Sequence, residues 1–227
     1  MRKFVLIPTR DDKGSLNPLR SFFEDAGYEV HFLIGESSIF SAYQNTIDKL
    51  KVKAKDTVIM CHDDIEILTK PSAFNSILDK ALNSPNVGFV GVAGTKILKP
   101  SAIWWDGVGT HDHFAGTVFH GKNIEDMFIT PYGNPGPVVV ADGLFLAAKG
   151  STLNSIQLKK PKSFPGDWDF YDIFYTYQAH RKGLVNMVAP IQILHESVGE
   201  LAGRDSWHDN KKAFLATFSQ ELPAVVH

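Results

Sequence analysis

Residues 1–92 switch repeatedly between short apolar runs and segments in which apolar residues recur every three or four positions. The runs predict β-strands, and the wider spacing predicts amphipathic helices. The predicted strands cover residues 4–8, 28–34, 58–65 and 87–92, and the predicted helices cover residues 16–26, 39–50 and 72–82. Strand and helix alternate with a step of about 30 residues, which predicts a parallel sheet with right-handed crossovers.

The pattern changes after Gly94. Residues 101–137 are rich in Gly, His and aromatic residues, show no helical period, and predict irregular structure with a hairpin. Beyond them we expect strands at 138–142, 185–188 and 191–194, a loop with a short helical piece at 149–168, and helices at 169–182 and 207–220. Residues 1–227 therefore predict a single α/β domain, in which a mostly parallel mixed sheet is flanked by helices and the second half is irregular.

Composition narrows the class of protein. Of the 227 residues, 44% are hydrophobic, and the net charge of −2 gives no overall basic field to attract nucleic acid or an anionic membrane. Lysine clusters at 49–55 and 159–162 fit solvated helix ends or loops. The one cysteine, Cys61, excludes an intramolecular disulfide and a cysteine-based zinc site. Neither a signal-peptide pattern nor an apolar stretch of about 18 residues occurs, so we expect a cytoplasmic protein without a membrane span.

Residues 57–67, TVIMCHDDIEI, form an apolar run that ends abruptly in His62, Asp63 and Asp64. Carboxylates at the end of a buried strand need a partner, because an unpaired buried charge is costly. That partner can be Arg, Lys or a divalent cation, and oxygen ligands at this edge of an α/β sheet suit Mg²⁺ or Mn²⁺. The alternative is that the aspartates cap the next helix.

Other polar residues stand at comparable positions. Asp142 and His195 each end an apolar run, and Asp169 and Asp172 begin a predicted helix. Because strand ends collect at one edge of an α/β sheet, we expect Asp64, Asp142 and His195 to converge there. Each residue also has a structural interpretation: a turn for Asp142, a hydrogen-bonded strand end for His195, and a first-turn acid for Asp172. No GxGxxG or GxxxxGK[ST] motif occurs to indicate a dinucleotide site or a P-loop.

The order and spacing of these positions resemble the GT-A glycosyltransferases, specifically the family 2-like group of short inverting enzymes that use nucleotide sugars. The likeness covers nearly the whole chain and is carried by residues 41–45, 62–64, 142–143, 170–172 and 195–197 and by the last helix. His62 stands where many relatives have the first Asp of a DxD motif, and Tyr171 stands where many have Glu.

The resemblance implies a nucleotide-sugar-binding half, residues 1–98, and an acceptor-binding and catalytic half, residues 99–227. It implies that Asp64 and His195 hold a Mn²⁺ or Mg²⁺ that bridges the donor diphosphate, and that Asp172 is the general base. The donor contacts that it implies are Thr9, Arg10, Asn45, His62, Asp63, Asp142 and Gly143.

The acceptor side offers further candidates. Trp104, Trp105 and Asp169 are candidate acceptor contacts. Adjacent residues of an extended segment point to opposite faces, so we expect one tryptophan to be exposed, the alternative being that both are core residues. His111, His113 and His120 form a second metal candidate, although no neighbouring Cys or Glu completes a tetrahedral site and a surface loop is the favoured interpretation.

The leading hypothesis is therefore a metal-dependent inverting transferase that moves a hexosyl or pentosyl group from a nucleoside-diphosphate sugar to an acceptor hydroxyl. We expect a UDP-linked donor, and the family implies a glycan or a lipid-linked glycan met at the membrane surface as acceptor. A modified nucleic-acid base is less expected because the net charge is not basic. The alternatives are a metal-dependent phosphoesterase or nuclease, and a non-catalytic nucleotide-sugar-binding domain.

Overall fold

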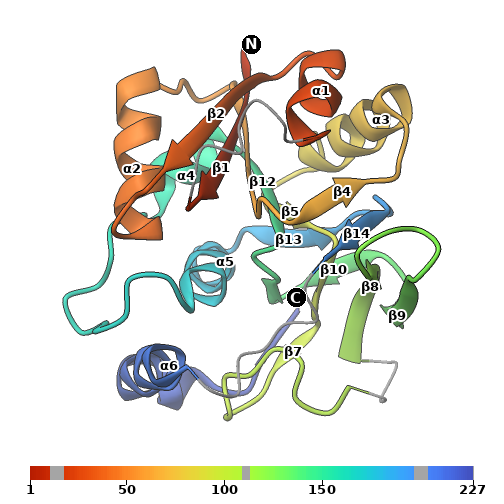
Figure 1. Cartoon of the computed structure of the whole chain (residues 1–227). Helices are drawn as coiled ribbons and strands as arrows, with labels where there is room; N and C mark the ends of the chain where they lie inside the picture. The colour runs from red at the N-terminus through yellow and green to blue at the C-terminus, as the bar shows by residue number, and fades with distance from the viewer. Residues whose placement is uncertain (11–17, 109–112, 197–203, 227) are drawn as a thin grey trace.

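Two sheets meet in the centre of the molecule, and helices cover the first of them (Figure 1). The structure, a computed structural model, describes residues 1–10, 18–108, 113–196 and 204–226. The helices are α1 (Pro18–Asp25), α2 (Ile39–Leu50), α3 (Pro71–Leu82), α4 (Gly150–Ser155), α5 (Tyr171–Arg181) and α6 (Asp205–Phe218), followed by a 3₁₀ turn (Ser219–Glu221). The strands are β1 (Lys3–Thr9), β2 (Glu29–Ile34), β3 (Thr57–Cys61), β4 (Ile65–Ile67), β5 (Val87–Gly91), β6 (Ala93–Thr95), β7 (Ile97–Leu98), β8 (Phe114–His120), β9 (Phe128–Gly133), β10 (Gly136–Val138), β11 (Val140–Ala141), β12 (Phe145–Lys149), β13 (Val185–Val188), β14 (Ile193–His195) and β15 (Ala224–Val225).

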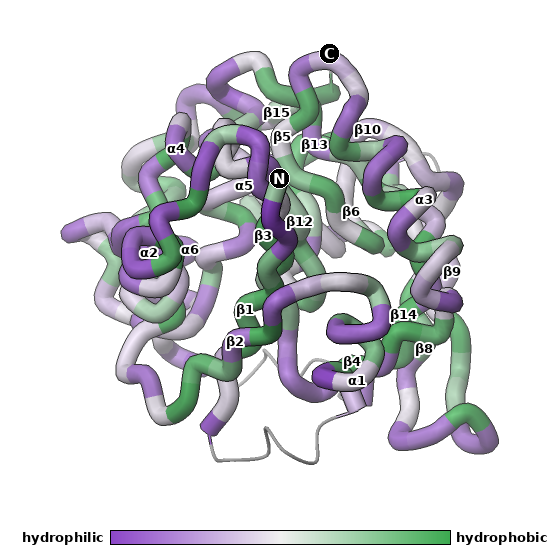
Figure 2. Tube along the Cα trace, turned by 90° about the horizontal axis from the view of Figure 1, so that it is seen from above, coloured by the Kyte–Doolittle hydropathy of each residue, from purple (hydrophilic) through white to green (hydrophobic). Residues whose placement is uncertain are grey.

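The first sheet has the strand order β10-β13-β5-β12-β3-β1-β2. β1 pairs in parallel with β2 and β3, as the alternation of strand and helix predicts. β12 lies antiparallel between β3 and β5, so these two strands do not pair directly. Every residue of β3 and β5 is buried, and apolar segments run through the middle of the molecule (Figure 2). The sheet is therefore mixed and mostly parallel on the side formed by residues 1–61.

The second sheet has the order β11-β6-β8-β14-β4, and β9 pairs with β8 to form the predicted hairpin. Within the described residues, the chain passes from the first sheet to this one four times, between β3 and β4, β5 and β6, β10 and β11, and β13 and β14. The predicted strands 58–65 and 138–142 are therefore wrong as continuous strands. Each is divided where the chain leaves one sheet for the other.

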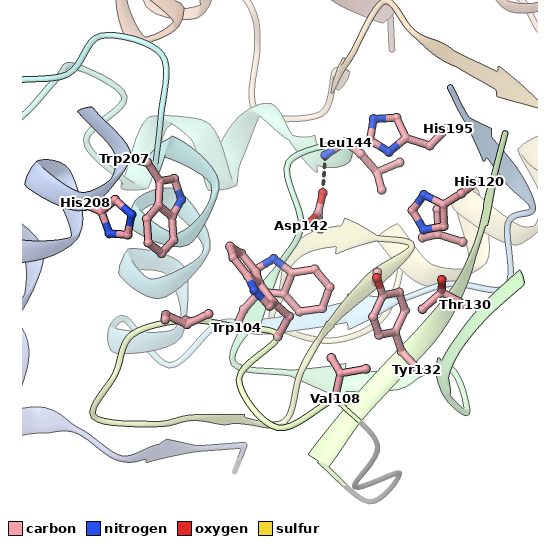
Figure 3. Close-up of a pocket in the computed structure, with 14 residues that line it drawn as sticks. Trp104, Val108, His120, Thr130, Tyr132, Asp142, Leu144, His195, Trp207 and His208 are labelled. Carbon is pink, nitrogen blue, oxygen red and sulfur yellow. Dashed lines mark hydrogen bonds between the residues drawn. The ribbon is translucent and has the colours of Figure 1, made fainter. Parts of the chain in front are cut away.

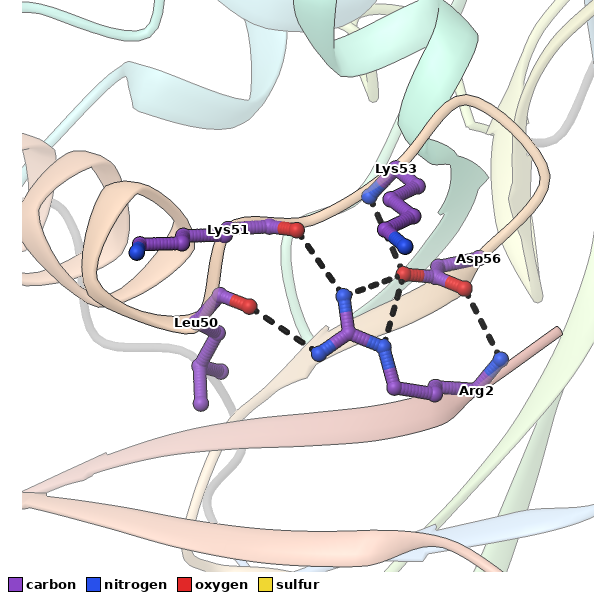
Figure 4. A network of polar contacts seen from close by, with 5 residues as sticks. All are labelled: Arg2, Leu50, Lys51, Lys53 and Asp56. Carbon is purple, nitrogen blue, oxygen red and sulfur yellow. Dashed lines mark hydrogen bonds and ion pairs between the residues drawn. The ribbon is translucent and has the colours of Figure 1, made fainter.

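A network of polar contacts holds the N-terminus against the loop after α2 (Figure 4). Asp56 accepts hydrogen bonds from the backbone N–H groups of Arg2 (2.8 Å) and Lys53 (3.0 Å), and its Oδ2 pairs with the Arg2 guanidinium at 2.7 Å. The same guanidinium donates to the carbonyl oxygens of Leu50 and Lys51. Although burial favours the neutral acid, these donors lower the pKa of Asp56 to about 2.

Among the described residues, no helix has the length and apolar character needed to cross a membrane.

Candidate active site

The crossover from β3 to β4 places His62, Asp63 and Asp64 between the two sheets. β4 pairs antiparallel with β14, with Ile65 opposite His195, and the Glu196 N–H donates to the Asp64 carbonyl oxygen at 2.9 Å. This register brings the His195 Nε2 to 3.4 Å from the Asp64 Oδ1. The strand pairing, rather than a single motif, therefore brings the two predicted metal ligands together.

His62 joins this pair through its Nδ1, which lies 3.7 Å from the Asp64 Oδ1. One ligand atom each from His62, Asp64 and His195 lie within 4.8 Å of one another, and we call these residues the cation triad. The side chains of His62 and Asp64 are about one-third exposed, whereas His195 is nearly buried. The triad is thus open on one side, where oxygen atoms of a ligand have room to approach.

Tyr171 determines which His62 nitrogen carries the proton. The Tyr171 hydroxyl donates its single hydrogen to the Gly143 carbonyl oxygen at 2.9 Å, and the His62 Nε2 lies 3.2 Å from the same hydroxyl. The His62 Nε2 must therefore be the donor, which leaves a lone pair on Nδ1 facing Asp64. Burial lowers the pKa of His62, which favours this neutral ring.

The donor set of the triad is one carboxylate and two imidazoles, which suits a transition-metal cation such as Mn²⁺ better than Mg²⁺, whose usual ligands are all oxygen. Burial alone would make Asp64 more basic and His195 less basic. Their mutual hydrogen bond and opposite charges prevail, so the pKa of Asp64 is lowered and that of His195 is raised. A cation would displace the proton that the two residues hold between them.

Two further carboxylates stand beside the triad. Asp142 follows β11, and its Oδ1 accepts a hydrogen bond from the Leu144 N–H at 2.8 Å. Asp172 lies in the first turn of α5, and its Oδ2 accepts from the Gly143 N–H at 3.0 Å. Burial, and then the negative charge of Asp142, raise the pKa of Asp172 to about 7. Asp172 is thereby poised to accept a proton near neutral pH.

Gly143 allows this close approach. A Cβ added at Gly143 would lie 2.4 Å from the Tyr171 hydroxyl oxygen and 3.0 Å from the Asp172 Cβ. Any larger residue would push α5 away from the segment that carries Asp142.

Two cavities open at this point, and both are lined by Trp104, Trp105, Asp142, His195 and Trp207. The smaller, of about 180 Å³, also contains His62 and Asp172, and we call it the acid pocket. The larger, of about 570 Å³, is the aromatic pocket (Figure 3). Its remaining lining residues are Ala93, Ile103, Val108, Val118, His120, Thr130, Tyr132, Leu144 and His208.

Comparison with known proteins agrees with this arrangement. A sequence model described as "Glycosyltransferase like family" matches residues 16–218. The chain belongs to this glycosyltransferase-like family. Its members are transferases, so the protein is an enzyme of that class. No curated protein matches the sequence.

Solved structures similar to this glycosyltransferase-like chain include A197 from STIV, with a TM-score of 0.52 and 16% identity over 87% of this chain and 86% of that one. GalNAc-T7, solved with UDP, GalNAc and Mn²⁺, has a TM-score of 0.50 and 8% identity over 88% of this chain and 44% of its own. Both likenesses concern the fold, which is of the GT-A type.

Not every predicted contact of the glycosyltransferase-like chain lies near the triad. Thr9 is buried at the end of β1, and the exposed Arg10 follows it. Asn45 is exposed on α2 and lines neither pocket. Asp63 is partly exposed beside Asp64. The donor roles of these residues stay predictions.

The acceptor candidates are placed unequally. Trp104 and Trp105 line both pockets, but they lie in a turn rather than an extended segment, so the predicted alternation of faces is wrong. Trp104 is buried and Trp105 is half-buried. Asp169 is buried, with its carboxylate paired to Arg204 at 3.2 Å and accepting a hydrogen bond from Ser206. Its side chain is thus engaged with the start of α6, and its acceptor role stays a prediction.

The second histidine cluster is only partly described. His111 lies outside the described residues. His113 immediately precedes β8, and His120 stacks on Phe128 with ring centroids 5.3 Å apart. Within the described part of the chain, the grouping of potential metal ligands is the cation triad, and its third member, His62, was predicted only as a donor contact.

Proposed function

We propose that the protein transfers a sugar from a nucleoside-diphosphate sugar to an acceptor hydroxyl, with a divalent cation and inversion at the anomeric carbon. The observation that carries this proposal is the position of the open cation triad beside Asp172, a half-buried carboxylate whose pKa is raised to about 7. A leaving diphosphate needs positive charge, and an acceptor hydroxyl needs a base. The triad and Asp172 supply the residues for both.

His62, Asp64 and His195 would hold the cation, which would neutralise charge on the leaving diphosphate as a Lewis acid. Asp172 would accept the proton of the acceptor hydroxyl as its oxygen bonds to the anomeric carbon. The bond from that carbon to the diphosphate oxygen breaks, and the electron pair leaves with the nucleotide. Because the base and the leaving group act from opposite faces, the configuration is inverted.

The first donor and cation to test are UDP sugars and Mn²⁺, since GalNAc-T7 was solved with UDP, GalNAc and Mn²⁺. A thermal-shift screen of UDP and UDP sugars, each with Mn²⁺ or with chelator, should give a rise in Tm that requires the cation. Asp64→Asn should abolish this rise. The matched control is Glu66→Gln, which changes an exposed acid two residues further along the chain, on β4, and should keep the rise in Tm.

Asp172→Asn tests the base. The variant should bind donor and cation like the wild type, while the rate of transfer falls at least about 100-fold, because general-base catalysis contributes roughly 10²–10⁴-fold. Loss of donor binding together with transfer would argue against this role. Hydrolysis of a generic phosphodiester without any response to nucleotide sugars would favour the phosphoesterase alternative.

A further inference from the structure

Tyr43, on α2, carries a hydroxyl group that the surrounding core does not satisfy. The side chain is fully buried, and within the described residues no acceptor meets the hydroxyl in hydrogen-bonding geometry. A buried hydroxyl without a partner destabilises the folded state, whereas Phe would fill the same space without that cost. The neighbouring Tyr175 has the ordinary arrangement, because its buried hydroxyl donates to the Leu158 carbonyl oxygen at 2.7 Å. The presence of Tyr rather than Phe at position 43 thus points to a role for the hydroxyl itself.

The Tyr171 hydroxyl is the polar group beside it. Tyr171 is the first residue of α5 (Figure 1), and its ring lies 6.0 Å from that of Tyr43 between centroids, with the ring planes inclined at 58°. Burial, and then the neighbouring Cys61 and Tyr175, raise the pKa of Tyr43, whereas hydrogen bonding with Tyr171 lowers it. The Tyr171 oxygen is thus the acceptor within reach of the Tyr43 hydrogen.

The Tyr171 oxygen has a lone pair for this hydrogen. Its own hydrogen goes to the Gly143 carbonyl oxygen at 2.9 Å, and the His62 Nε2 lies 3.2 Å away. A phenolic oxygen donates one hydrogen and accepts others through its lone pairs. When hydrogens arrive from Tyr43 and from His62, the oxygen donates only to Gly143. The arrangement in which Tyr171 donates to His62 is then excluded.

The excluded arrangement is the one that would remove His62 from the cation triad. In it the His62 hydrogen is on Nδ1, where the Asp64 carboxylate lies 3.7 Å away and attracts it. A nitrogen that carries a hydrogen has no lone pair for a cation. Before a cation binds, Asp64 therefore favours the tautomer that cannot coordinate, and the contacts at Nε2 must outweigh that preference.

We propose that Tyr43 is a positioning residue for the cation triad: its hydroxyl donates to the Tyr171 oxygen and thereby keeps the His62 hydrogen on Nε2. Tyr43 lines neither pocket, so it acts only through Tyr171. The three side chains come from α2, α5 and the crossover after β3, and one line of hydrogen bonds joins them. The inference rests on the proposed function for the role of the triad as a cation site.

Tyr43→Phe removes the hydroxyl and keeps the ring. Tyr175→Phe is the matched control, because it removes the hydroxyl of an equally buried tyrosine that contacts Leu158 instead. Mn²⁺ binding is measured by calorimetry without nucleotide. In chelator at pH 8, ¹⁵N NMR of the histidine rings reports the tautomer of His62, whose signal is assigned by its loss in His62→Gln.

Tyr43→Phe should weaken Mn²⁺ binding at least about threefold, a part of the roughly 10–100-fold typical of residues that support a metal ligand directly. Its His62 should gain the tautomer with the hydrogen on Nδ1, while the wild type and Tyr175→Phe keep it on Nε2. An unchanged His62 signal in Tyr43→Phe would overturn the proposal, whatever the affinity. The same loss of Mn²⁺ binding in Tyr175→Phe would also overturn it, because packing would then be the cause.

The double variant Tyr43→Phe/Tyr171→Phe shows whether Tyr43 acts through Tyr171. If it does, the double variant binds Mn²⁺ no more weakly than Tyr171→Phe alone, since the hydroxyl on which Tyr43 acts is already gone. Losses of affinity that add in the double variant would contradict this line of hydrogen bonds.

Failure of the proposed function has a different signature. In that case the wild type does not bind Mn²⁺, with or without UDP. A change of tautomer in Tyr43→Phe, measured in chelator, would then support the hydrogen bonds from Tyr43 to His62 without the transferase. Mn²⁺ binding by the wild type without a change of tautomer in Tyr43→Phe would overturn the inference and leave the proposed function standing.

Discussion

Asp172 and Asp142 form a pair of acids that cannot both ionise without cost. Each is held by a backbone N–H from the same short segment, that of Gly143 for Asp172 and that of Leu144 for Asp142. The two carboxylates are therefore fixed near each other by the chain itself. Burial and the charge of Asp142 keep the pKa of Asp172 at about 7 rather than near 4. This value suits a base that must be ionised before it accepts a proton.

The dependence of transfer on pH should reveal this pair. We expect kcat/KM of the wild type to rise with pH through about 7 and then level off, because Asp172 must be ionised. Asp142→Asn removes the like charge and keeps an oxygen for the Leu144 N–H. In this variant kcat/KM should begin to rise at a lower pH than in the wild type, whatever value it reaches at high pH. An unchanged rise in the pH–rate profile of this variant would contradict the assignment.

The position of one proton on the His62 ring decides whether Nδ1 can coordinate a cation. His62→Asn keeps a polar atom near the position of Nδ1, and His62→Gln keeps one near that of Nε2, which contacts Tyr171. If Nδ1 faces the cation, His62→Gln should bind Mn²⁺ at least about tenfold more weakly than His62→Asn, measured by calorimetry without nucleotide.

Tyr171→Phe is the companion variant. It removes the hydroxyl that accepts from Nε2, and changes at such supporting residues typically weaken metal affinity by roughly 10–100-fold. Equal Mn²⁺ affinity in His62→Asn and His62→Gln would contradict coordination through Nδ1.

Among elements, the passages of the chain between the two sheets position the chemistry. The apolar periodicity predicted α2 over its full extent and β13 residue for residue, because each is one uninterrupted element with a clear pattern. It could not reveal that the run 58–65 divides at His62, since the division depends on a different sheet accepting β4. The antiparallel strand β12 was missed for a similar reason. It is a short apolar run soon after another, and its partners are distant in sequence.

The candidate site, like the two sheets, could be predicted only in part. Asp64 and His195 could be proposed because each ends an apolar run. The third position of the triad depends on Tyr171, which lies 109 residues from His62. No local pattern around His62 reports that contact.

A buried amide, that of Asn210, helps to hold the last helix against the site. Asn210 donates to the carbonyl oxygens of Gly166 (3.1 Å) and Asp169 (2.9 Å) and accepts from the Gly166 N–H (2.8 Å). Asn210→Ala leaves these backbone groups buried without partners, which should lower the free energy of unfolding by about 2–3 kcal/mol. Asn45→Ala, at an exposed position of α2, should change it by less than about 0.5 kcal/mol. Urea denaturation measures both, and equal effects would refute this role.

For the whole molecule, two aspartates give opposite dependences of stability on pH. Asp56 has a pKa lowered to about 2, so its contribution is present above the ordinary pKa near 4 and is lost as pH falls toward 2. Asp172 has a pKa raised to about 7, so the folded state holds its proton while the unfolded state does not. The stability that this raised pKa gives the folded state is fully present below about pH 4 and is lost as pH rises through 7. Above pH 7, ionised Asp56 therefore stabilises the folded state, whereas the ionisation of Asp172 lowers its stability.

Removing the acid of the site should therefore stabilise the protein while abolishing transfer. In chelator, Asp172→Asn should raise Tm at pH 8 by at least about 3 °C, which is roughly 1 kcal/mol for a chain of this size. The increment should vanish near pH 4, where the wild-type carboxyl is protonated in both states. Asp56→Asn is the matched control, because the same substitution at the N-terminal network should lower Tm at pH 8. If Asp172→Asn also lowers Tm, the carboxylate supports the fold, and its raised pKa is no mark of a base.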